Sequence, residues 1–280
     1  MTLGVSPAYF ISKFTDRFAP DDVLRSIPVL RSRGYGAFQV EICRRDALSL
    51  WTTSMVDQVS NECLKSGMRV SQFVCHHWME DFSIASRILS PIEPSQYAAE
   101  LDLAAKFPGC TQVTVPLARF VLDSMETNPV EMYRNVYGRL VEHIHQVLKL
   151  AKERSLRVAL ELQPGACISG IEGFLRVWNL LSDVSLGYNF DTGHANASKE
   201  QVEIIPLILG DRIFGTHLCD NHGNENLSLA PGDGSIDWAK LLGALNEIGY
   251  RGSYDLEILC PTGEVEAAYL RGLNHLRGKF

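Results

Sequence analysis

Residues 157–164 read RVALELQP, a short run of β-branched and aliphatic side chains that contains one acid, Glu161, and ends at Pro164. A run of this length and composition is typical of a β-strand. Comparable runs lie on both sides of it along the chain. They are LGVSPAYF (3–10), YGAFQVEI (35–42), RVSQFVCHH (69–77), QVTVPL (112–117), SLGYNFDTGH (185–194), IFGTHLCDN (213–221) and GSYDLEIL (252–259).

The spacing of these eight runs indicates the fold class. The first and last runs start 249 residues apart, so the mean interval is about 36 residues, close to the length of one strand–helix unit. Helix signals lie between the runs. Asn128 is an N-cap candidate followed by Pro129 and Glu131, and Ser235 can cap a later helix. We therefore predict a single (β/α)₈ barrel domain over residues 1–280.

An open, doubly wound sheet is the main rival for such an alternation. It should carry a glycine-rich turn after its first strand, but residues 11–20 read ISKFTDRFAP. One local misfit is Pro28, which falls inside the first expected helix and should kink or shorten it. The long segments 79–94 and 221–234 would follow strands, and in a barrel such loops form the C-terminal face where active sites are built.

Composition narrows the partners and the compartment. The chain has 26 Lys+Arg and 33 Asp+Glu, and its net charge of −7 disfavours nucleic acid or anionic lipid as a partner. The longest stretches without Asp, Glu, Lys or Arg are 12 residues, too short to cross a membrane. The start MTLGVSPAYF does not have the pattern of a secretion signal, and the 7 cysteines are widely spaced. We expect a cytoplasmic protein with reduced thiols.

Four ionisable residues stand inside apolar strands, where inward-facing side chains are normally packed and apolar. They occur in consecutive runs and are Glu161, Asp191, His217 and Glu257. Neighbouring strands lie about 4.8 Å apart, so one inward residue at matching height on each can converge on a single point. Three carboxylates at one point repel, and protonation or a bound cation relieves the repulsion. Oxygen ligands with one imidazole suit Mg²⁺, Mn²⁺, Co²⁺ or Zn²⁺, so we predict one divalent metal ion.

The motifs around these residues resemble a known superfamily. LELQP with Glu161, FDTGH with Asp191 and His194, HLCDN with His217, GDGSIDW, and LEI with Glu257 resemble the xylose-isomerase-like TIM-barrel superfamily of sugar isomerases, epimerases and inosose dehydratases. The resemblance implies that the two glutamates, Asp191 and His217 bind one divalent metal, often Mn²⁺, Co²⁺ or Mg²⁺. It also implies that the glutamates can move protons and that His194 contacts a substrate oxygen.

A site of this kind suits removal of a proton beside a carbonyl. A metal that chelates the carbonyl and the adjacent hydroxyl of a keto-sugar stabilises the cis-enediolate that forms, and Glu161 and Glu257 can act as acid and base from different sides. The leading hypothesis is a divalent-metal-dependent sugar isomerase or epimerase. The same groups can expel a β-hydroxyl as water, so the alternative is a lyase or dehydratase acting on a keto-inositol or a 3-keto-glycoside.

A hydrolase of the endonuclease IV type is a third hypothesis from a different class. That branch resembles the same superfamily and shares the Asp-x-x-His motif, but it needs three zinc ions and further histidines. The fourth run, QVTVPL (112–117), supplies no histidine, and the net charge of −7 disfavours a DNA-gripping surface. We therefore expect no nucleic-acid partner.

Several polar or aromatic residues near the strand ends are candidates for substrate contact: His194, Glu41, His76, Trp78 and Asp220. Glu41 can instead form a salt bridge with a neighbouring arginine at the barrel rim. Trp78 can cover an apolar sugar face or anchor a packed loop. His76 and His77 are adjacent, so at most one of them faces the pocket if they lie on a strand.

The expected substrate is small and unphosphorylated. Barrel enzymes often hold phosphate with the loops after strands seven and eight, which here read NHGNENLSLAPGDGS and CPTGEVE and contain no Lys or Arg. A sugar or cyclitol is thus the predicted partner, and a homo-oligomer is left open.

Overall fold

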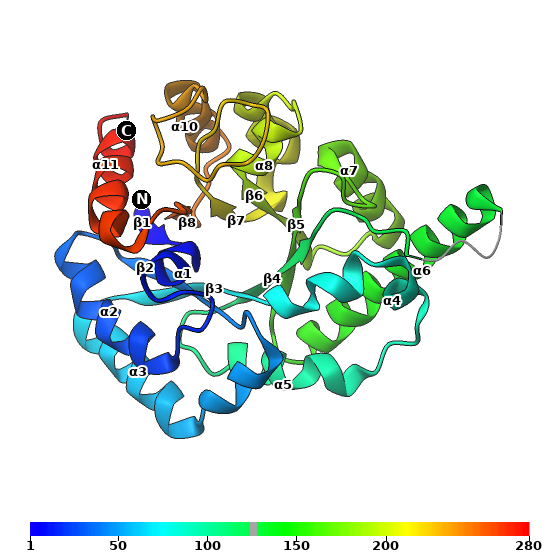
Figure 1. Ribbon diagram of the computed structural model, residues 1–280, viewed down its shortest axis with the longest axis horizontal. Helices are drawn as coiled ribbons and strands as arrows, with labels where there is room; N and C mark the ends of the chain where they lie inside the picture. The colour runs from blue at the N-terminus through cyan, green and yellow to red at the C-terminus, as the bar shows by residue number, and fades with distance from the viewer. Residues whose placement is uncertain (124–127, 280) are drawn as a thin grey trace.

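The computed structural model describes residues 1–123 and 128–279, and it confirms the predicted (β/α)₈ barrel (Figure 1). Eight parallel strands follow one another in the order β7-β6-β5-β4-β3-β2-β1-β8, with the helices outside them. The two end strands of this order meet through backbone hydrogen bonds. Leu218 N donates to Asp255 O at 2.8 Å, and Glu257 N donates to Leu218 O at 3.0 Å. These bonds close the barrel.

The strands are short and mostly buried along their whole length. They are β1 (Thr2–Val5), β2 (Ala37–Glu41), β3 (Arg69–Val74), β4 (Gln112–Leu117), β5 (Arg157–Leu162), β6 (Leu186–Asp191), β7 (Ile213–His217) and β8 (Ser253–Leu256).

Helices connect successive strands and cover the barrel. The α-helices are α1 (Ala8–Phe14), α2 (Pro20–Ser32), α3 (Thr53–Ser66), α4 (Ala85–Leu89), α5 (Pro94–Ala104), α6 (Pro129–Lys152), α7 (Gly170–Leu181), α8 (Thr192–Ala197), α9 (Ile205–Leu209), α10 (Trp238–Glu247) and α11 (Val265–Arg277). Short 3₁₀ helices are η1 (Arg45–Leu50), η2 (His76–Phe82), η3 (Val202–Ile204), η4 (Gly210–Arg212) and η5 (Thr262–Glu264).

The longest helix shows how the sequence specifies these elements. Asn128 caps α6 because its side-chain oxygen accepts a hydrogen bond from Val130 N at 2.9 Å, as predicted. Apolar residues at helical spacing, among them Val136, Leu140 and Ile144, are fully buried against the barrel. The main hydrophobic core therefore lies between the outer face of the sheet and the inner faces of the helices, which leaves the barrel interior for other residues.

Two local predictions were wrong, and a third, at Pro28, was wrong only in that the helix is not shortened there. The first run, expected as a strand over residues 3–10, ends as a strand at Val5 because the chain turns at Pro7 into α1. Helix α10 is capped by Asp237, which accepts from Lys240 N at 3.2 Å, whereas Ser235 donates to the backbone of the preceding loop. Helix α2 continues past Pro28 to Ser32.

Two further features concern the helices and the cysteines. Within residues 1–123 and 128–279, no helix combines the length and apolar character needed to span a membrane. All 7 cysteines are free thiols, and four of them are buried.

Candidate metal centre and active site

Four strand ends place the predicted metal ligands together at the carboxyl-terminal mouth of the barrel. Glu161 lies near the end of β5, Asp191 and His217 are the last residues of β6 and β7, and Glu257 directly follows β8. Asp191 and His217 are register partners across β6 and β7. One ligand atom from each of the four residues lies within 4.8 Å of the others. The parallel register thus turns four separate sequence positions into one cluster.

His217 stands at the middle of this cluster. Its Nδ1 atom lies 2.8 Å from Glu257 Oε2, 3.2 Å from Glu161 Oε2 and 4.0 Å from Asp191 Oδ2. Glu161, Asp191 and His217 are buried, and the Glu257 side chain is only 15% exposed. Low exposure weakens screening by water, so the charges in this cluster act strongly on one another.

The pKa shifts follow from this crowding. Burial raises the pKa of Asp191 to about 7, and the carboxylates of Glu257 and Glu161 act in the same direction. For His217, burial opposes the charged form, but the same two glutamates outweigh it and hold its pKa well above the usual value. Burial would raise the pKa of Glu161, yet the imidazoles of His217 and His194 lower it instead. In the absence of a cation, bound protons would offset the negative charge of the carboxylates.

His194 completes the inner wall of the site. Asp191 Oδ1 accepts a hydrogen bond from His194 N at 2.8 Å and so caps α8. His194 Nε2 lies 3.5 Å from both Glu161 Oε1 and Asp191 Oδ2. Burial disfavours the imidazolium, but Asp191 and Glu161 outweigh it and raise the pKa of His194 to about 9. One short turn therefore positions a carboxylate and an imidazole against the same glutamate.

The donor atoms fit a divalent cation. Among the described residues, Asp191 Oδ2 and His217 Nδ1 are buried side-chain atoms that make no hydrogen bond, and both face the centre of the cluster. An unpaired buried polar atom is costly, and a metal ion would satisfy two at once. Three carboxylates and one imidazole are ligands used by Mg²⁺, Mn²⁺, Co²⁺ and Zn²⁺.

A cavity of about 260 Å³ opens beside the cluster. Glu161, His194, His217 and Glu257 line one side of it, and Glu41 and His76 contribute to the rest of its wall. His76 Nδ1 lies 2.8 Å from Glu41 Oε1, and this hydrogen bond, which outweighs burial, raises the pKa of His76. Glu41 therefore pairs with His76, in place of the arginine contact that the sequence left open.

The cavity also has lining residues that the sequence reasoning did not single out. They are Pro7, Ala8, Ile11, Val74, Pro116, Gln163, Asn226, Ser228 and Leu259. Gln163 is part of the LELQP motif, so its place just beyond β5 was a usable signal. Asn226 and Ser228 belong to the irregular segment 221–234, where spacing gives no clue to side-chain direction.

The structure does not support two of the predicted substrate contacts. Trp78 is fully buried in the hydrophobic core, where its ring packs edge-on against Tyr97 with a centroid separation of 4.7 Å. Asp220 is also fully buried, and its carboxylate accepts hydrogen bonds from Gly232 N at 3.0 Å and from Trp238 Nε1 at 2.8 Å. Trp78 anchors the η2 segment, and Asp220 organises the loop after β7.

The fold and the site together define a (β/α)₈ barrel with a candidate divalent-metal centre at the carboxyl ends of its last four strands. The sequence pattern of the xylose isomerase-like TIM barrel family matches residues 27–279. The chain therefore belongs to that family.

Solved structures with the same fold cover nearly the whole chain. The 3-keto-D-glucoside 4-epimerase YcjR from E. coli aligns with a TM-score of 0.77 and 18% identity over 99% of each chain. The IolI protein with a bound zinc atom aligns with a TM-score of 0.74 and 15% identity over 100% of this chain and 99% of the other. At these identities the similarity establishes the fold alone.

Curated relatives match only in part. The 3-dehydroshikimate dehydratase of Pseudomonas putida is 29% identical over 154 residues, which is 49% of this chain and 24% of the dehydratase. The chain spans from 24% to 46% of the length of the curated relatives it matches.

Proposed function

We propose that this protein is a divalent-metal-dependent isomerase or epimerase of a small keto-sugar, with Glu161 and Glu257 as the proton-transferring pair. The observation that carries the proposal is that these two glutamates approach one imidazole from β5 and β8 inside the same cavity. Their Oε2 atoms lie 3.2 Å and 2.8 Å from His217 Nδ1. Two more strands separate them in the barrel, so they reach the cavity from different directions.

Two opposed carboxylates are what an epimerisation needs. One glutamate takes the proton from the carbon beside the carbonyl, and the other returns a proton to the opposite face of the same carbon. A divalent cation bound to Glu161, Asp191, His217 and Glu257 would supply positive charge that stabilises the enediolate. His194, 3.5 Å from Glu161 Oε1, holds that carboxylate in place.

The remaining wall of the cavity supports a neutral, hydroxyl-rich substrate. Glu41 and His76 form a hydrogen-bonded pair that can accept from and donate to sugar hydroxyls. Among the described residues that line the cavity, none is Lys or Arg. A phosphate group would find no side-chain cation there, so we propose an unphosphorylated sugar or cyclitol as the substrate.

The comparisons support this chemistry without specifying a substrate. The name of the 3-keto-D-glucoside 4-epimerase states an epimerisation of a keto-glucoside, and Glu161 and Glu257 could supply the proton transfers for an epimerisation here. The bound zinc atom of the IolI structure supports a divalent metal as cofactor in this fold.

A specific observation favours one alternative. The partial match to a 3-dehydroshikimate dehydratase supports a lyase that removes water from a keto-inositol or a 3-keto-glycoside. In that reaction one glutamate removes the proton beside the carbonyl, the enediolate expels the β-hydroxyl, and the other glutamate protonates the leaving oxygen to give water. The first step is shared with epimerisation.

The test is exchange of substrate protons for deuterium in D₂O, with Mn²⁺ present, over a panel of ketoses, keto-inositols and 3-keto-glycosides and of phosphorylated ketoses. We expect exchange at the carbon beside the carbonyl for at least one unphosphorylated compound, and its loss in Glu161→Gln and Glu257→Gln. An inverted centre in the product identifies an epimerase, whereas a conjugated enone or diketone absorbance identifies a dehydratase. Exchange restricted to phosphorylated sugars, or undiminished in both variants, would overturn the proposal.

A further inference from the structure

The barrel interior beneath the metal centre is filled with side-chain amides. Gln39, Gln72, Gln112 and Asn189 are at most 4% exposed, and we call these four residues the amide layer. The interior of such a barrel is usually packed with branched aliphatic residues. A buried amide destabilises the fold unless its hydrogen bonds are satisfied. Four buried amides in one barrel interior therefore need hydrogen-bond partners there.

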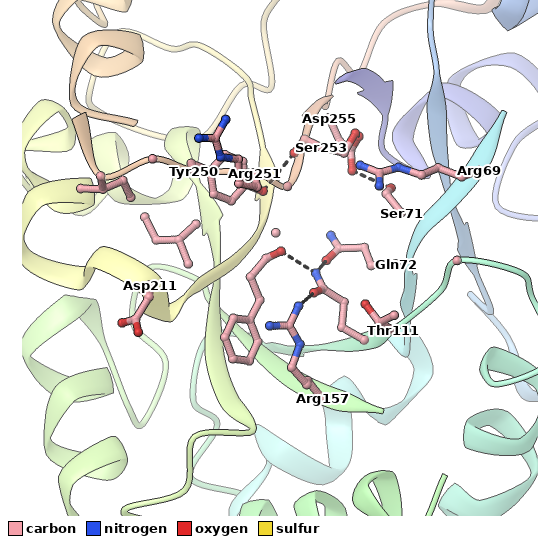
Figure 2. Close-up of a pocket in the computed structure, with 18 of the residues that line it drawn as sticks. Arg69, Ser71, Gln72, Thr111, Arg157, Asp211, Tyr250, Arg251, Ser253 and Asp255 are labelled. Carbon is pink, nitrogen blue, oxygen red and sulfur yellow. Dashed lines mark hydrogen bonds between the residues drawn. The ribbon is translucent and has the colours of Figure 1, made fainter. Parts of the chain in front are cut away.

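One chain of hydrogen bonds crosses the interior from end to end. At the amino-terminal mouth, Arg157 Nη2 donates to Gln112 Oε1 at 2.9 Å, and Gln112 Nε2 donates to Gln72 Oε1 at 2.8 Å (Figure 2). Gln72 Nε2 then donates to Asn189 Oδ1 at 2.9 Å. Asn189 Nδ2 donates to Glu161 Oε2 at 3.3 Å. The chain ends on a predicted metal ligand.

The direction of this chain is fixed by its two ends. A guanidinium group can only donate hydrogen bonds, and an ionised carboxylate can only accept them. Arg157 therefore requires an amide oxygen on its side, and Glu161 requires an amide nitrogen on its side. Each amide in between has one orientation that satisfies both neighbours, and aligned hydrogen bonds of this kind reinforce one another.

A second, shorter chain ends on His217. Gln39 Oε1 lies 2.8 Å from His217 Nε2, and Gln39 Nε2 donates to Asp255 Oδ2 at 2.8 Å. Asp255 is buried and also accepts hydrogen bonds from Ser71 Oγ and Ser253 Oγ (Figure 2). Because the Asp255 carboxylate takes the amide nitrogen of Gln39, the amide oxygen is left to face His217. That oxygen accepts the Nε2 proton of His217.

Glycines make room for both chains. A Cβ atom on Gly215 would collide with Gln72 Oε1 and lie 2.6 Å from Asn189 Oδ1. A Cβ atom on Gly4 would collide with Asp255 Oδ1. The strands therefore have glycine at the two positions where a larger side chain would overlap with the amide layer or with Asp255.

We propose that the amide layer positions two ligands of the metal centre, with Gln39 and Asp255 holding the proton of His217 on Nε2. This tautomer leaves the lone pair of Nδ1, the atom that faces Glu161 and Glu257, free to bind a cation. The inference rests on the proposed function only in that a divalent metal binds at this centre. Partners of metal-bound histidines commonly change metal affinity by 10- to 100-fold when they are removed.

The experiment measures metal affinity and the imidazole proton separately. Chelator competition gives the Kd for Mn²⁺ and Zn²⁺, and NMR of the zinc-loaded protein reports the Nε2–H proton of His217, assigned by comparison with His217→Asn. In the wild type we expect the proton on Nε2. Gln39→Leu removes the acceptor, so we expect Kd to rise about 10- to 100-fold and the Nε2–H signal to be lost through exchange with water.

An exchanged pair separates positioning from packing. In the double variant Gln39→Glu/Asp255→Asn, a carboxylate at position 39 accepts from His217, and the amide at position 255 donates to that carboxylate. We expect this variant to recover the wild-type Kd within about threefold and to recover the Nε2–H signal. Ser71→Ala is the matched control, because it removes a contact of Asp255 without changing the Gln39 acceptor, and its Kd should stay at the wild-type value.

The outcomes distinguish the two proposals. A wild type that binds neither metal overturns the metal centre and this inference with it. Metal binding by the wild type with an unchanged Kd in Gln39→Leu overturns the positioning role alone. If Gln39→Leu does not fold, the wild-type spectrum still decides, since a zinc-loaded protein with the His217 proton on Nδ1 contradicts the proposed tautomer.

Discussion

The two mouths of the barrel differ in how completely their buried polar atoms are hydrogen-bonded. The amino-terminal mouth holds a cavity of about 350 Å³, lined by Arg69, Arg157 and Arg251 together with Asp211 and Asp255 (Figure 2). The carboxyl-terminal mouth holds a cavity of about 260 Å³ beside four acids and three histidines. The larger of these two cavities is therefore not the one beside the predicted metal ligands.

Hydrogen bonding distinguishes the two cavities better than their volumes do. Of the described residues that line the amino-terminal cavity, none has a buried side-chain polar atom without a hydrogen bond. At the other mouth, Asp191 Oδ2 makes no hydrogen bond, and His217 Nδ1 has only the nearby carboxylates of Glu257 and Glu161 as partners. A cation bound at this cluster would pair with both atoms. This difference supports the proposal that the reaction takes place at the carboxyl-terminal mouth.

The largest expected effect comes from changing Glu257, directly after the carboxyl end of β8. Glu257→Gln removes one proton carrier at the carboxyl end, so we expect the deuterium exchange rate to fall by about 10²- to 10⁴-fold. Arg251→Gln, at the amino-terminal mouth of the same strand, is the matched control and should leave the rate unchanged. Equal losses in the two variants would contradict the assignment of chemistry to one end.

Metal removal should have the next largest effect. A cation at about 100 times its Kd stabilises the folded state by about 2.7 kcal/mol, so chelation should lower the melting temperature by several degrees. Asp191→Asn removes one carboxylate from the centre, and its melting temperature should respond less to chelator than that of the wild type. A melting temperature that ignores both chelator and added Mn²⁺ would count against a metal centre.

The sequence predicted the carboxyl-terminal mouth better than the interior, and the reason is physical. Glu161, Asp191, His217 and Glu257 are charged residues in apolar strands, and a buried charge stands out in any hydrophobic pattern. Gln39 and Asn189 alternate with apolar neighbours as ordinary half-buried strand residues do. Their partners lie 178 and 28 positions away, so only the folded barrel shows that they face predicted ligands.

Where the sequence reasoning failed, tertiary packing decided the outcome. Trp78 follows two histidines, which suggested a pocket, but the chain enters a 3₁₀ helix there and turns the indole into the core. Asp220 sits in a ligand-bearing motif, yet its carboxylate is used by backbone and indole donors of its own loop. The SPAYF segment was apolar enough for a strand, and Pro7 directs it into α1.

Crowding in the amide layer gives a third prediction, on stability. Gly215→Ala places a methyl group against Gln72 and Asn189, so at least one of these amides must move and break a buried hydrogen bond. We expect a loss of about 1–3 kcal/mol in the free energy of unfolding by urea. Gly243→Ala, in α10 where an added Cβ meets open space, is the control and should be neutral or stabilising. A neutral Gly215→Ala would show that the layer is loosely packed.

The smallest effect is expected where the long chain of amides begins. Arg157→Met leaves an unbranched apolar side chain but removes the donor to Gln112 and the guanidinium, whose Cζ atom lies 4.0 Å from the centroid of the Phe214 ring. One hydrogen bond and one cation–π contact at the edge of the interior are lost, so the free energy of unfolding should fall by about 1–2 kcal/mol. Glu161 still orients Asn189 from the other end, and the Kd for Mn²⁺ should therefore change by less than about threefold. A larger change in Kd would mean that Arg157 sets the direction of all the hydrogen bonds between it and Glu161. Metal affinity at the carboxyl-terminal mouth would then depend on a residue at the amino-terminal mouth.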